Sequence, residues 1–259
     1  MDSTDTYSEF LKGKRVALIG PSESIEGASQ GEFVDSHDVV VRMVRPVRHV
    51  PTAADMEIVP KRLQKDIGTT SHVVYSNFDG VCLNDNYLNH LVERGVKYFN
   101  STRPAEYGNN SINDYKPLLE EAGLLSCAPP IPKYENWSDS LKASPCSGFC
   151  ILLDLLSHDV KELYVFGYSF HKDLAIKEWL SHNNVTREWY RNDNMGEGVS
   201  GIHQQAPVSE SDDITKWKRE VNSRGQHLHN HEKERIYFKK EILAKDPRVI
   251  ADNSMIKFL

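Results

Sequence analysis

The residues best suited to chemistry lie near the end of the chain, in the segment His229-Asn230-His231-Glu232-Lys233-Glu234. A histidine at the amino end of a helix has its charged form disfavoured by the positive end of the helix dipole, so the ring stays neutral, as a general base requires. Glu232 and Glu234 act in the opposite direction, so the net effect on the pKa of His229 stays open. The simpler alternative is an exposed His229 beside a helix-capping Asn230, and the segment taken alone favours it.

The alternating histidines His227, His229 and His231 raise the question of a metal site. In an extended chain this spacing could present them together to a zinc ion. The apolar residues that recur from Ile236 onward predict a helix instead, and helical residues two positions apart do not share a face. We therefore expect no metal ion, and no cofactor, at this segment.

A second candidate lies upstream, where Ser144-Pro145-Cys146-Ser147-Gly148 opens an apolar run. A proline, a small hydroxyl residue and a glycine at a helix start leave backbone N–H groups without partners, and the helix dipole there favours an anion such as a phosphate. The alternative is that Ser147 merely caps the helix, and this segment alone favours that interpretation.

The third candidate is the loop that follows the apolar run of residues 16–19. Gly20-Pro21-Ser22 interrupts any strand or helix, and Ser24 follows closely. A buried strand that ends in glycine and small hydroxyl residues presents backbone N–H groups at the carboxyl edge of a sheet, where open α/β sheets bind their ligands. We predict that the stretch 14–43 provides half of a site for a phosphate-bearing ligand.

Arginines cluster after the next apolar run, at Arg42, Arg45 and Arg48. An arginine can bind a carboxylate or phosphate through two parallel hydrogen bonds. The alternative is a solvated face with one structural salt bridge, which we favour for Arg48 and leave open for Arg45.

The elements that would position these residues alternate between strand and helix. Strands are predicted from apolar runs at 15–19, 38–43, 72–76, 96–99, 162–166 and 248–251. Helices are predicted at 84–94, 112–122, 147–157, 212–222 and 230–244, and irregular chain at 45–65 and 128–137. This order implies right-handed crossovers and a mainly parallel sheet, so the fold class is α/β, Rossmann-like, with flanking helices in a single domain.

Around this domain we predict a polar lead over residues 1–13 that could hold a short helix, and a long loop over 168–210. A loop of this length in a compact domain is usually a lid, a binding loop or disordered. Residues 14–259, including this loop, form one domain. With 259 residues and 39% apolar content, the chain can bury one sizeable core.

The composition excludes several classes of protein. A net charge of −6 argues against a general nucleic-acid binder. The sequence contains no GxGxxG, GxxxxGK[ST], HExxH or GxSxG motif, which removes the commonest dinucleotide, phosphoryl-transfer, zinc-protease and serine-hydrolase assignments. The four cysteines form no CxxC pair and indicate free thiols in a reducing compartment.

The first residues lack the basic and apolar regions of a signal peptide, and no apolar run is long enough to span a bilayer. We therefore expect a soluble, cytoplasmic protein without a transmembrane segment, which could still touch a membrane surface peripherally. A membrane-anchored enzyme trimmed of its anchor would have the same sequence features.

Taken together and in this order, these segments resemble the sialyltransferase family, glycosyltransferase family 29. Residues 16–43 are similar to the family's long motif: an apolar strand, a Gly-x-Ser loop, then Asp35-Ser36-His37-Asp38 and Arg42-Met43. The stretch 66–70, Asp-Ile-Gly-Thr-Thr, is similar to the far end of that motif.

The later segments continue the resemblance. Residues 145–148 through 164–167 are similar to the family's short motif, and His229 with Glu234 fits its late His-x-x-x-x-Glu motif. The likeness implies that residues 14–259 are a sialyltransferase-like catalytic domain, with 168–210 as a possible acceptor lid.

The resemblance implies an inverting, metal-independent transfer of a ulosonic acid from a CMP-sugar donor to a hydroxyl of a glycan or glycolipid. His229 would take the proton from that hydroxyl, with Glu234 as its motif partner. A further histidine would contact the leaving phosphate; His203 is our choice and His171 its competitor. The substrate-binding residues would be Gly20, Pro21, Ser22, Ser24, Arg42, Cys146, Ser147, Gly148 and Gly167.

The chain also departs from the family. Pro21 and Val44 stand where the family usually has nucleotide-contacting asparagines, and neither side chain is polar. Ala17 replaces a cysteine of the animal members, so their motif-linking disulfide is absent. These departures indicate a distant bacterial, viral or algal relative, with CMP-Kdo as an alternative donor. Two rivals remain: a non-catalytic nucleotide- or glycan-binding module with the same fold, and a Rossmann-like enzyme of different chemistry.

Overall fold

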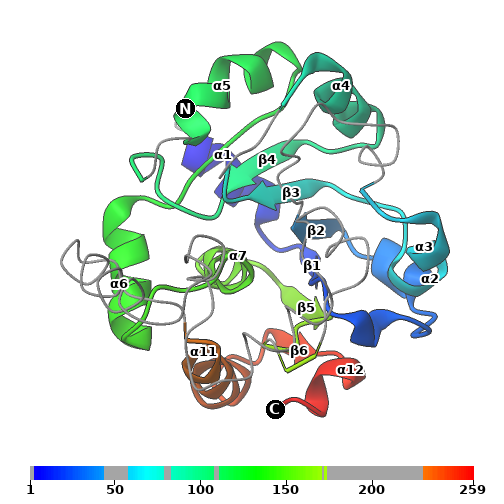
Figure 1. The fold of residues 1–259 in the computed structure, drawn as a ribbon, viewed down its shortest axis with the longest axis vertical. Helices are drawn as coiled ribbons and strands as arrows, with labels where there is room; N and C mark the ends of the chain where they lie inside the picture. The colour runs from blue at the N-terminus through cyan, green and yellow to red at the C-terminus, as the bar shows by residue number, and fades with distance from the viewer. Residues whose placement is uncertain (1–2, 44–57, 79–82, 108–110, 171, 174–229) are drawn as a thin grey trace, which may run out of the picture.

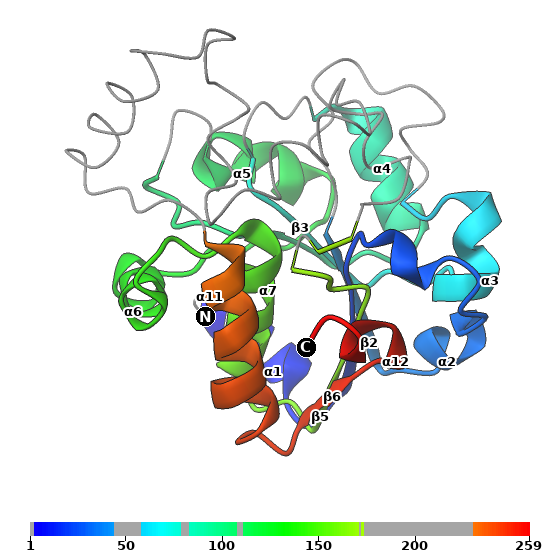
Figure 2. The ribbon, with the colours of Figure 1, turned by 60° about the horizontal axis from the view of Figure 1, so that its bottom comes forward.

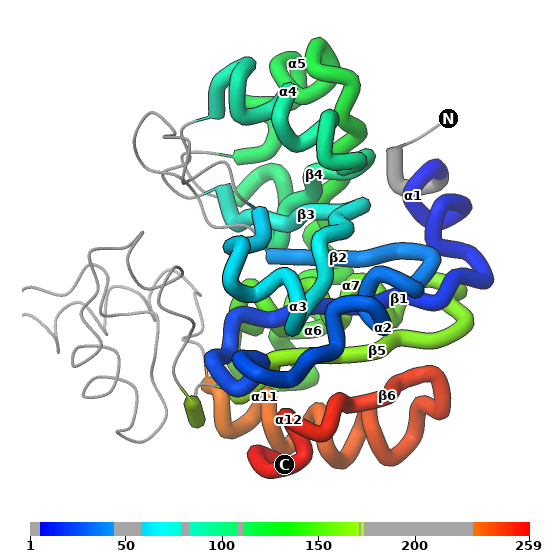
Figure 3. Tube along the Cα trace, turned by 90° about the vertical axis from the view of Figure 1, so that its right-hand side faces the viewer, coloured from blue at the N-terminus to red at the C-terminus, as the bar shows by residue number. Residues whose placement is uncertain are grey.

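A computed structural model describes residues 3–43, 58–78, 83–107, 111–170, 172–173 and 230–259. Its centre is a six-stranded parallel sheet of order β4-β3-β2-β1-β5-β6 (Figure 1). Figure 3 shows the strands edge to edge, from β4 at the top to β6 at the bottom. The strands are β1 (Arg15–Ile19), β2 (Val39–Met43), β3 (Val73–Ser76), β4 (Tyr98–Ser101), β5 (Glu162–Phe166) and β6 (Val249–Ala251). The predicted α/β fold is confirmed.

The central strands are apolar without alternation because helices cover both of their faces. Successive side chains of a strand point to opposite faces. In β1, Val16 and Leu18 join a core cluster with the apolar residues of α7 (Ser147–Leu156), whereas Ala17 and Ile19 join another with Val34 of α2 (Gly31–Asp35).

The remaining helices complete the two layers. Figure 2 shows α7 and α11 on one side of the sheet and α2, α3 and α12 on the other. Their bounds are α1 (Ser3–Leu11), α3 (Gln64–Ile67), α4 (Asp85–Glu93), α5 (Ile112–Glu121), α6 (Ile131–Leu141), α11 (His231–Tyr237) and α12 (Asn253–Ile256). Two 3₁₀ turns, η1 (Glu23–Ile25) and η2 (Lys61–Leu63), and a π-helical segment, η3 (Phe238–Leu243), join them.

The order of the strands creates a switch point. The chain builds β1 to β4 outward in one direction and then returns to place β5 on the other side of β1. In open α/β sheets, the crevice outside the carboxyl ends of the strands at such a point is the usual ligand site. Here it lies where Gly20 follows β1 and Gly167 follows β5.

One sequence prediction is wrong at the level of an element. We predicted irregular chain over 128–137, but α6 covers Ile131–Leu141. Pro132 lies in its first turn, where a missing N–H costs nothing and the fixed φ suits a helix. Tyr134, Trp137 and Leu141 then recur at helical spacing and are buried.

Other boundaries differ by a few residues. The fourth strand begins at Tyr98, two positions later than predicted. Val96, before the strand, packs in a core cluster with the apolar residues of α4. The predicted helix over 230–244 is α11 followed by the π-helical η3. The predicted lead does contain a helix, α1, and it buries Tyr7 and Leu11 against the main core. The predicted helix at 212–222 lies outside the described residues.

Within the described ranges, no helix is long and apolar enough to cross a lipid bilayer.

Candidate functional site

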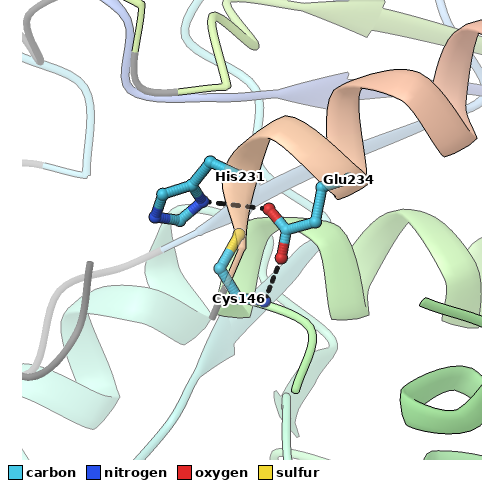
Figure 4. Close-up of side chains that lie close together, drawn as sticks. All are labelled: Cys146, His231 and Glu234. Carbon is cyan, nitrogen blue, oxygen red and sulfur yellow. Dashed lines mark hydrogen bonds and ion pairs between the residues drawn. The ribbon is translucent and has the colours of Figure 1, made fainter. Parts of the chain in front are cut away.

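Glu234 joins the starts of two helices that are far apart in the sequence. Its Oε1 accepts a hydrogen bond from the backbone N–H of Cys146, at 2.6 Å, and its Oε2 lies 3.0 Å from Nδ1 of His231 (Figure 4). The Glu234 side chain is only 1% exposed. A buried carboxylate needs such partners because its desolvation would otherwise be costly. The bonds therefore fix the start of α11 against the start of α7.

His231 is neutral in this setting. Burial lowers the pKa of His231 to about 4. Because a carboxylate oxygen only accepts hydrogen bonds, the proton of the neutral ring belongs on Nδ1, facing Glu234. The lone pair is then on Nε2, and Figure 4 shows that side of the ring turned away from Glu234. This is the tautomer that a general base requires.

The start of α11 is built by its own sequence. Asn230 is the N-cap, and its side-chain oxygen accepts the backbone N–H of Lys233 at 3.0 Å, as the sequence indicated for a capping asparagine. Lys233 also donates from Nζ to the carbonyl of Lys142, just beyond α6, at 2.9 Å. The helix start is thus tied to α6 as well as to α7.

Tyr168 packs against the end of β1 at the switch point, next to the end of β5. Gly20 donates its backbone N–H to the carbonyl of Phe166 at 2.7 Å. A Cβ at Gly20 would lie 2.5 Å from the carbonyl oxygen of Gly167 and 2.6 Å from the Tyr168 ring. Only a glycine at position 20 therefore allows the two strand ends and the ring to approach this closely.

Tyr168 also reaches the start of α7. Its hydroxyl donates to the carbonyl of Gly148 at 3.0 Å, and a Cβ at Gly148 would lie 3.2 Å from its ring. Gly20 and Gly148, both predicted from the sequence as substrate-binding residues, thus contact one side chain, and Gly167, predicted likewise, lies against the backbone of Gly20. Gly167 has φ +65°, which favours glycine.

These contacts form one continuous group. Gly20, in the loop after β1, lies close to the ring of Tyr168, which follows β5, and the Tyr168 hydroxyl donates to Gly148 in the first turn of α7. Cys146, just before that turn, donates its N–H to Glu234 of α11. The three segments that the sequence singled out therefore meet at the carboxyl edge of the sheet.

Ser22 and Ser24 form a small hydroxyl cluster in the loop after β1. The Ser22 Oγ lies 2.9 Å from the Ser24 Oγ and donates to Asp173 at 3.2 Å. The Ser22 backbone N–H donates to the carbonyl of Gly167 at 3.1 Å. Pro21, between Gly20 and Ser22, has no N–H to offer. The substrate contacts predicted for these three residues stay predictions.

Arg42, at the end of β2, stabilises the turn at residues 66–70. Its side chain is buried and donates from Nε to the carbonyl of Thr70 and to the Ser71 hydroxyl, each at 3.0 Å, and from Nη2 to the carbonyl of Ile67 at 2.7 Å. Burial lowers the pKa of Arg42 to about 10, so the guanidinium stays charged at neutral pH. These bonds serve the 66–70 turn, and the substrate contact that we predicted for Arg42 has no support from them.

Asp35 secures the same turn from the other side. Its carboxylate accepts the backbone N–H groups of Thr69 and Thr70, each at 3.0 Å. The stretches 35–38 and 66–70, which we compared with two ends of one motif, therefore touch. The hydrogen bonds from Thr69 and Thr70 to Asp35 stabilise the turn at residues 66–70.

Ser147 is not the capping residue of α7. The N-cap is Cys146, which makes no side-chain capping bond, and Ser147 is the first helical residue. The carboxylate of Glu234 instead accepts the Cys146 N–H. Sequence analysis could not find this cap, because its donor and acceptor lie 88 positions apart.

Within the described residues, Cys146, His231 and Glu234 form the one group whose ligand atoms could surround a metal ion, since these atoms lie within 4.8 Å of one another. In this structure the three side chains interact with one another. Burial raises the pKa of the Cys146 thiol well above its usual value. Both oxygens of Glu234 already accept hydrogen bonds.

Several predicted residues lie outside the described ranges. These are the candidate base His229, both candidates for the phosphate contact, His203 and His171, and the positions Val44, Arg45 and Arg48. His231, by contrast, was considered in the sequence only as one of three alternating histidines. The signal for its contact with Glu234 is the three-residue spacing between them, which places both side chains on one face of a helix.

Comparisons with known proteins find similar folds but no close relative. Neither a protein-family model nor a curated protein sequence matches the chain. Among solved structures, a mammalian sialyltransferase in complex with Gal-beta-1-3GalNAc-ortho-nitrophenol is 12% identical, with a TM-score of 0.48, covering 95% of this chain and 71% of the other. The sialyltransferase CstII from Campylobacter jejuni with cytidine-5'-monophosphate is 13% identical, with a TM-score of 0.39, covering 69% and 76%. At these values we base no functional argument on the likeness.

Proposed function

We propose that the chain is an inverting, metal-independent glycosyltransferase. It transfers a ulosonic acid, sialic acid or a Kdo-like sugar, from a CMP-sugar donor to a hydroxyl group of a glycan or glycolipid. The observation that supports this most is the hydrogen bond between Glu234 and the Cys146 N–H. It joins the segment assigned to proton transfer to the segment assigned to the donor phosphate.

The donor would bind at the switch point between β1 and β5. The first turn of α7, at Ser147 and Gly148, directs backbone N–H groups and the positive end of the helix dipole toward this edge of the sheet. The loop from Gly20 to Ser24 would hold the nucleotide from the side of β1. Preorganised N–H groups of this kind stabilise the negative charge that develops on a departing phosphate.

The chemistry needs one proton acceptor and no metal. The acceptor hydroxyl attacks the anomeric carbon while a base removes its proton, and the bond from that carbon to the phosphate oxygen breaks with its electron pair leaving on CMP. A single displacement of this kind inverts the anomeric configuration. The base lies in the segment that begins α11; His229 is the choice from the sequence.

The test is a CMP-release assay with CMP-sialic acid and CMP-Kdo, each with and without EDTA, and with a panel of glycan acceptors. We expect release that depends on an acceptor and is unchanged by EDTA. A second measurement, thermal unfolding with CMP and with UMP as a control, should show stabilisation by CMP alone; at 100 times its Kd a ligand adds about 2.7 kcal/mol. No release and no stabilisation with any donor would contradict the proposal.

A non-catalytic binding module is the second candidate. Pro21 favours it, because this position in the donor loop offers neither a polar side chain nor an N–H. Stabilisation by CMP without release from either donor, across the acceptor panel, would select this candidate over the transferase.

A further inference from the structure

We propose that Cys146, His231 and Glu234 form a binding site for a divalent metal ion of the zinc class, and that the bound ion inhibits the transfer. The binding does not depend on the proposed function, whereas the inhibition rests on it. One ligand atom of each side chain lies within 4.8 Å of those of the other two. The sequence pointed only to the alternating histidines, because the thiol of this site comes from the start of α7 and the other two ligands come from α11.

Two of the three ligand atoms already lie close to the separation that a metal requires. Nδ1 of His231 and Oε2 of Glu234 are 3.0 Å apart, since residues three positions apart share one face of a helix. In a tetrahedral zinc site the ligand atoms lie about 3.3 to 3.6 Å from one another. The ion would take the place of the proton between Nδ1 and Oε2, so the other ring nitrogen need not take part.

The third ligand atom needs only a small movement. Figure 4 shows the Cys146 sulfur turned toward the pair formed by His231 and Glu234. From a separation of at most 4.8 Å, a shift of about 1 Å in the sulfur completes a tetrahedral arrangement. The His231 side chain is 11% exposed and Cys146 is partly exposed, so the group lies near enough to the surface for an ion to enter.

The types of ligand select the class of metal. Thiolate, imidazole and carboxylate are the protein ligands of zinc, and three of them leave one position for water. Magnesium and calcium prefer oxygen ligands and are not suited to a thiolate. A coordinated thiol gives up its proton, so Cys146 and the buried Glu234 would bring two negative charges, which one divalent ion neutralises.

The carboxylate is already oriented for coordination. Oε1 of Glu234 accepts the backbone N–H of Cys146 at 2.6 Å, and this bond directs Oε2 toward His231. The side chain of Asn230 caps the same turn by accepting the N–H of Lys233. Hydrogen bonds that orient the ligands raise the affinity of a metal site. Both supporting bonds are present without an ion.

A bound ion would affect the segment to which we assign proton transfer. It would tie the start of α11 to the start of α7 through side chains as well as through the Cys146 N–H. Both Nδ1 of His231 and Oε2 of Glu234 would then be metal ligands. Because the proposed transfer needs no metal, we expect added zinc to inhibit CMP release and EDTA to reverse the inhibition.

The experiment measures metal binding directly, on the whole chain purified without metal. Co²⁺ is the first probe, because it occupies tetrahedral zinc sites and its bond to a thiolate gives a charge-transfer absorption band. The chain has 11 histidines that could bind either ion weakly elsewhere, so the readout must report the thiol. We expect the band in the wild type, its loss when Zn²⁺ displaces Co²⁺, and no competition by Mg²⁺.

Matched serine variants test the ligand assignment. Cys146→Ser removes the thiol and keeps the backbone N–H that binds Glu234. Cys150→Ser is the control, since it removes a buried thiol of the same helix that is not part of the group. Loss of an outer hydrogen-bond partner alone costs a metal site about 10- to 100-fold in affinity. We therefore expect Cys146→Ser to weaken zinc binding by about 100-fold or more and Cys150→Ser by about threefold or less.

A second variant and a second measurement guard against a folding defect. His231→Gln should weaken zinc binding as Cys146→Ser does. Zinc should raise the unfolding temperature of the wild type and of Cys150→Ser, and should leave that of Cys146→Ser unchanged, with each protein compared to its own metal-free form.

The outcomes for the metal and for the transfer are separate. No charge-transfer band in the wild type, zinc affinity in Cys146→Ser within about threefold of the wild type, or competition by Mg²⁺ would overturn the site. Full CMP release at a zinc concentration that saturates the site would overturn the inhibition. CMP release in EDTA from a chain that binds no zinc would contradict this inference alone, and zinc binding without CMP release in EDTA would contradict the proposed function alone.

Discussion

At the scale of single residues, the bond between Nδ1 of His231 and Glu234 gives a prediction about the tautomer. In Glu234→Gln, the side-chain oxygen can still accept the Cys146 N–H, but the amide then presents an N–H group to Nδ1. Nδ1 of His231 then faces an amide instead of a carboxylate, in the segment to which we assign proton transfer. We expect the transfer rate to fall by about 10² to 10⁴-fold with little change in thermal stability. A drop in stability with full activity in the folded fraction would contradict this.

The buried position of His231 also predicts the pH dependence of the reaction. Its pKa of about 4 lies below the value of a free histidine, so the ring is neutral and competent above pH 4 and protonated below it. Among the described residues, the Glu234 carboxylate and the Cys146 thiol lie beside the ring. We expect kcat/KM to stay level from pH 7 to about 5 and to fall toward pH 4, measured with a donor and acceptor that do not titrate in this range. An acid limb near pH 6.5 would instead indicate a base with the pKa of a free histidine.

At the scale of elements, a buried carboxylate connects α7 to its neighbours. Asp154 accepts from the Tyr75 hydroxyl of β3 at 2.7 Å and from Nζ of Lys133 of α6 at 2.6 Å. Tyr7 of α1 joins through the Tyr75 hydroxyl at 3.0 Å. This network explains why α1, which we expected to be part of a polar lead, packs firmly against the sheet.

The charge of Asp154 predicts how stability depends on pH. Burial alone would raise the pKa of Asp154, but the nearby His158 ring, 3.8 Å away, and the hydrogen-bonded ammonium of Lys133 outweigh burial and lower the pKa to about 2. Since the pKa is lower in the folded state, the unfolded chain binds more protons between about pH 4 and 2. The contribution, about 2 kcal/mol, is therefore present above pH 4 and lost as the pH falls toward 2.

The matching variant is Asp154→Asn. It leaves Lys133 without its charged partner and should cost about 3 kcal/mol at pH 7, with a smaller difference from wild type below pH 4. The control is Glu162→Gln, which breaks the half-exposed ion pair with Arg15 and should cost about 0 to 1 kcal/mol. Urea midpoints at pH 7 and pH 3 measure both. Equal losses in the two variants would show that burial of the Asp154 charge is not what stabilises the helix.

The strand ends at the switch point give a steric prediction. A methyl group at Gly20 would meet the backbone carbonyl of Gly167 at 2.5 Å, whereas one at Gly148 would meet only the Tyr168 ring, at 3.2 Å. Gly20→Ala should therefore destabilise the protein by about 1 to 3 kcal/mol and weaken the response to CMP. Gly148→Ala should do less, and thermal unfolding with and without CMP compares them. The reverse order would mean that Tyr168, and not the strand ends, sets the packing at this point.

At the scale of the whole molecule, the sequence predicts the sheet well because its strands are apolar on both faces, as the buried runs of β1 and β2 show. The prediction fails for α6, because the prolines in and before its first turn indicated irregular chain. Its buried face depends on contacts with the rest of the core, which the local sequence does not show. That the glycines at 20, 148 and 167 lie at one edge of the sheet could be predicted, because Gly20 and Gly167 follow strands and Gly148 lies in the first turn of a helix; their part in substrate binding stays a prediction. The pairing of Glu234 with Cys146 and His231 could not, because it depends on where α11 docks.

The claim that unites these scales is that the switch point and the start of α11 form one site for CMP-sugar transfer. The most direct measurement is the rate of acceptor-dependent CMP release by the wild-type chain, in EDTA, beside Glu234→Gln. We predict release well above the rate without protein in the wild type and a loss of about 100-fold or more in the variant. Equal release by both proteins, or none by the wild type from either CMP-sialic acid or CMP-Kdo, would contradict the account.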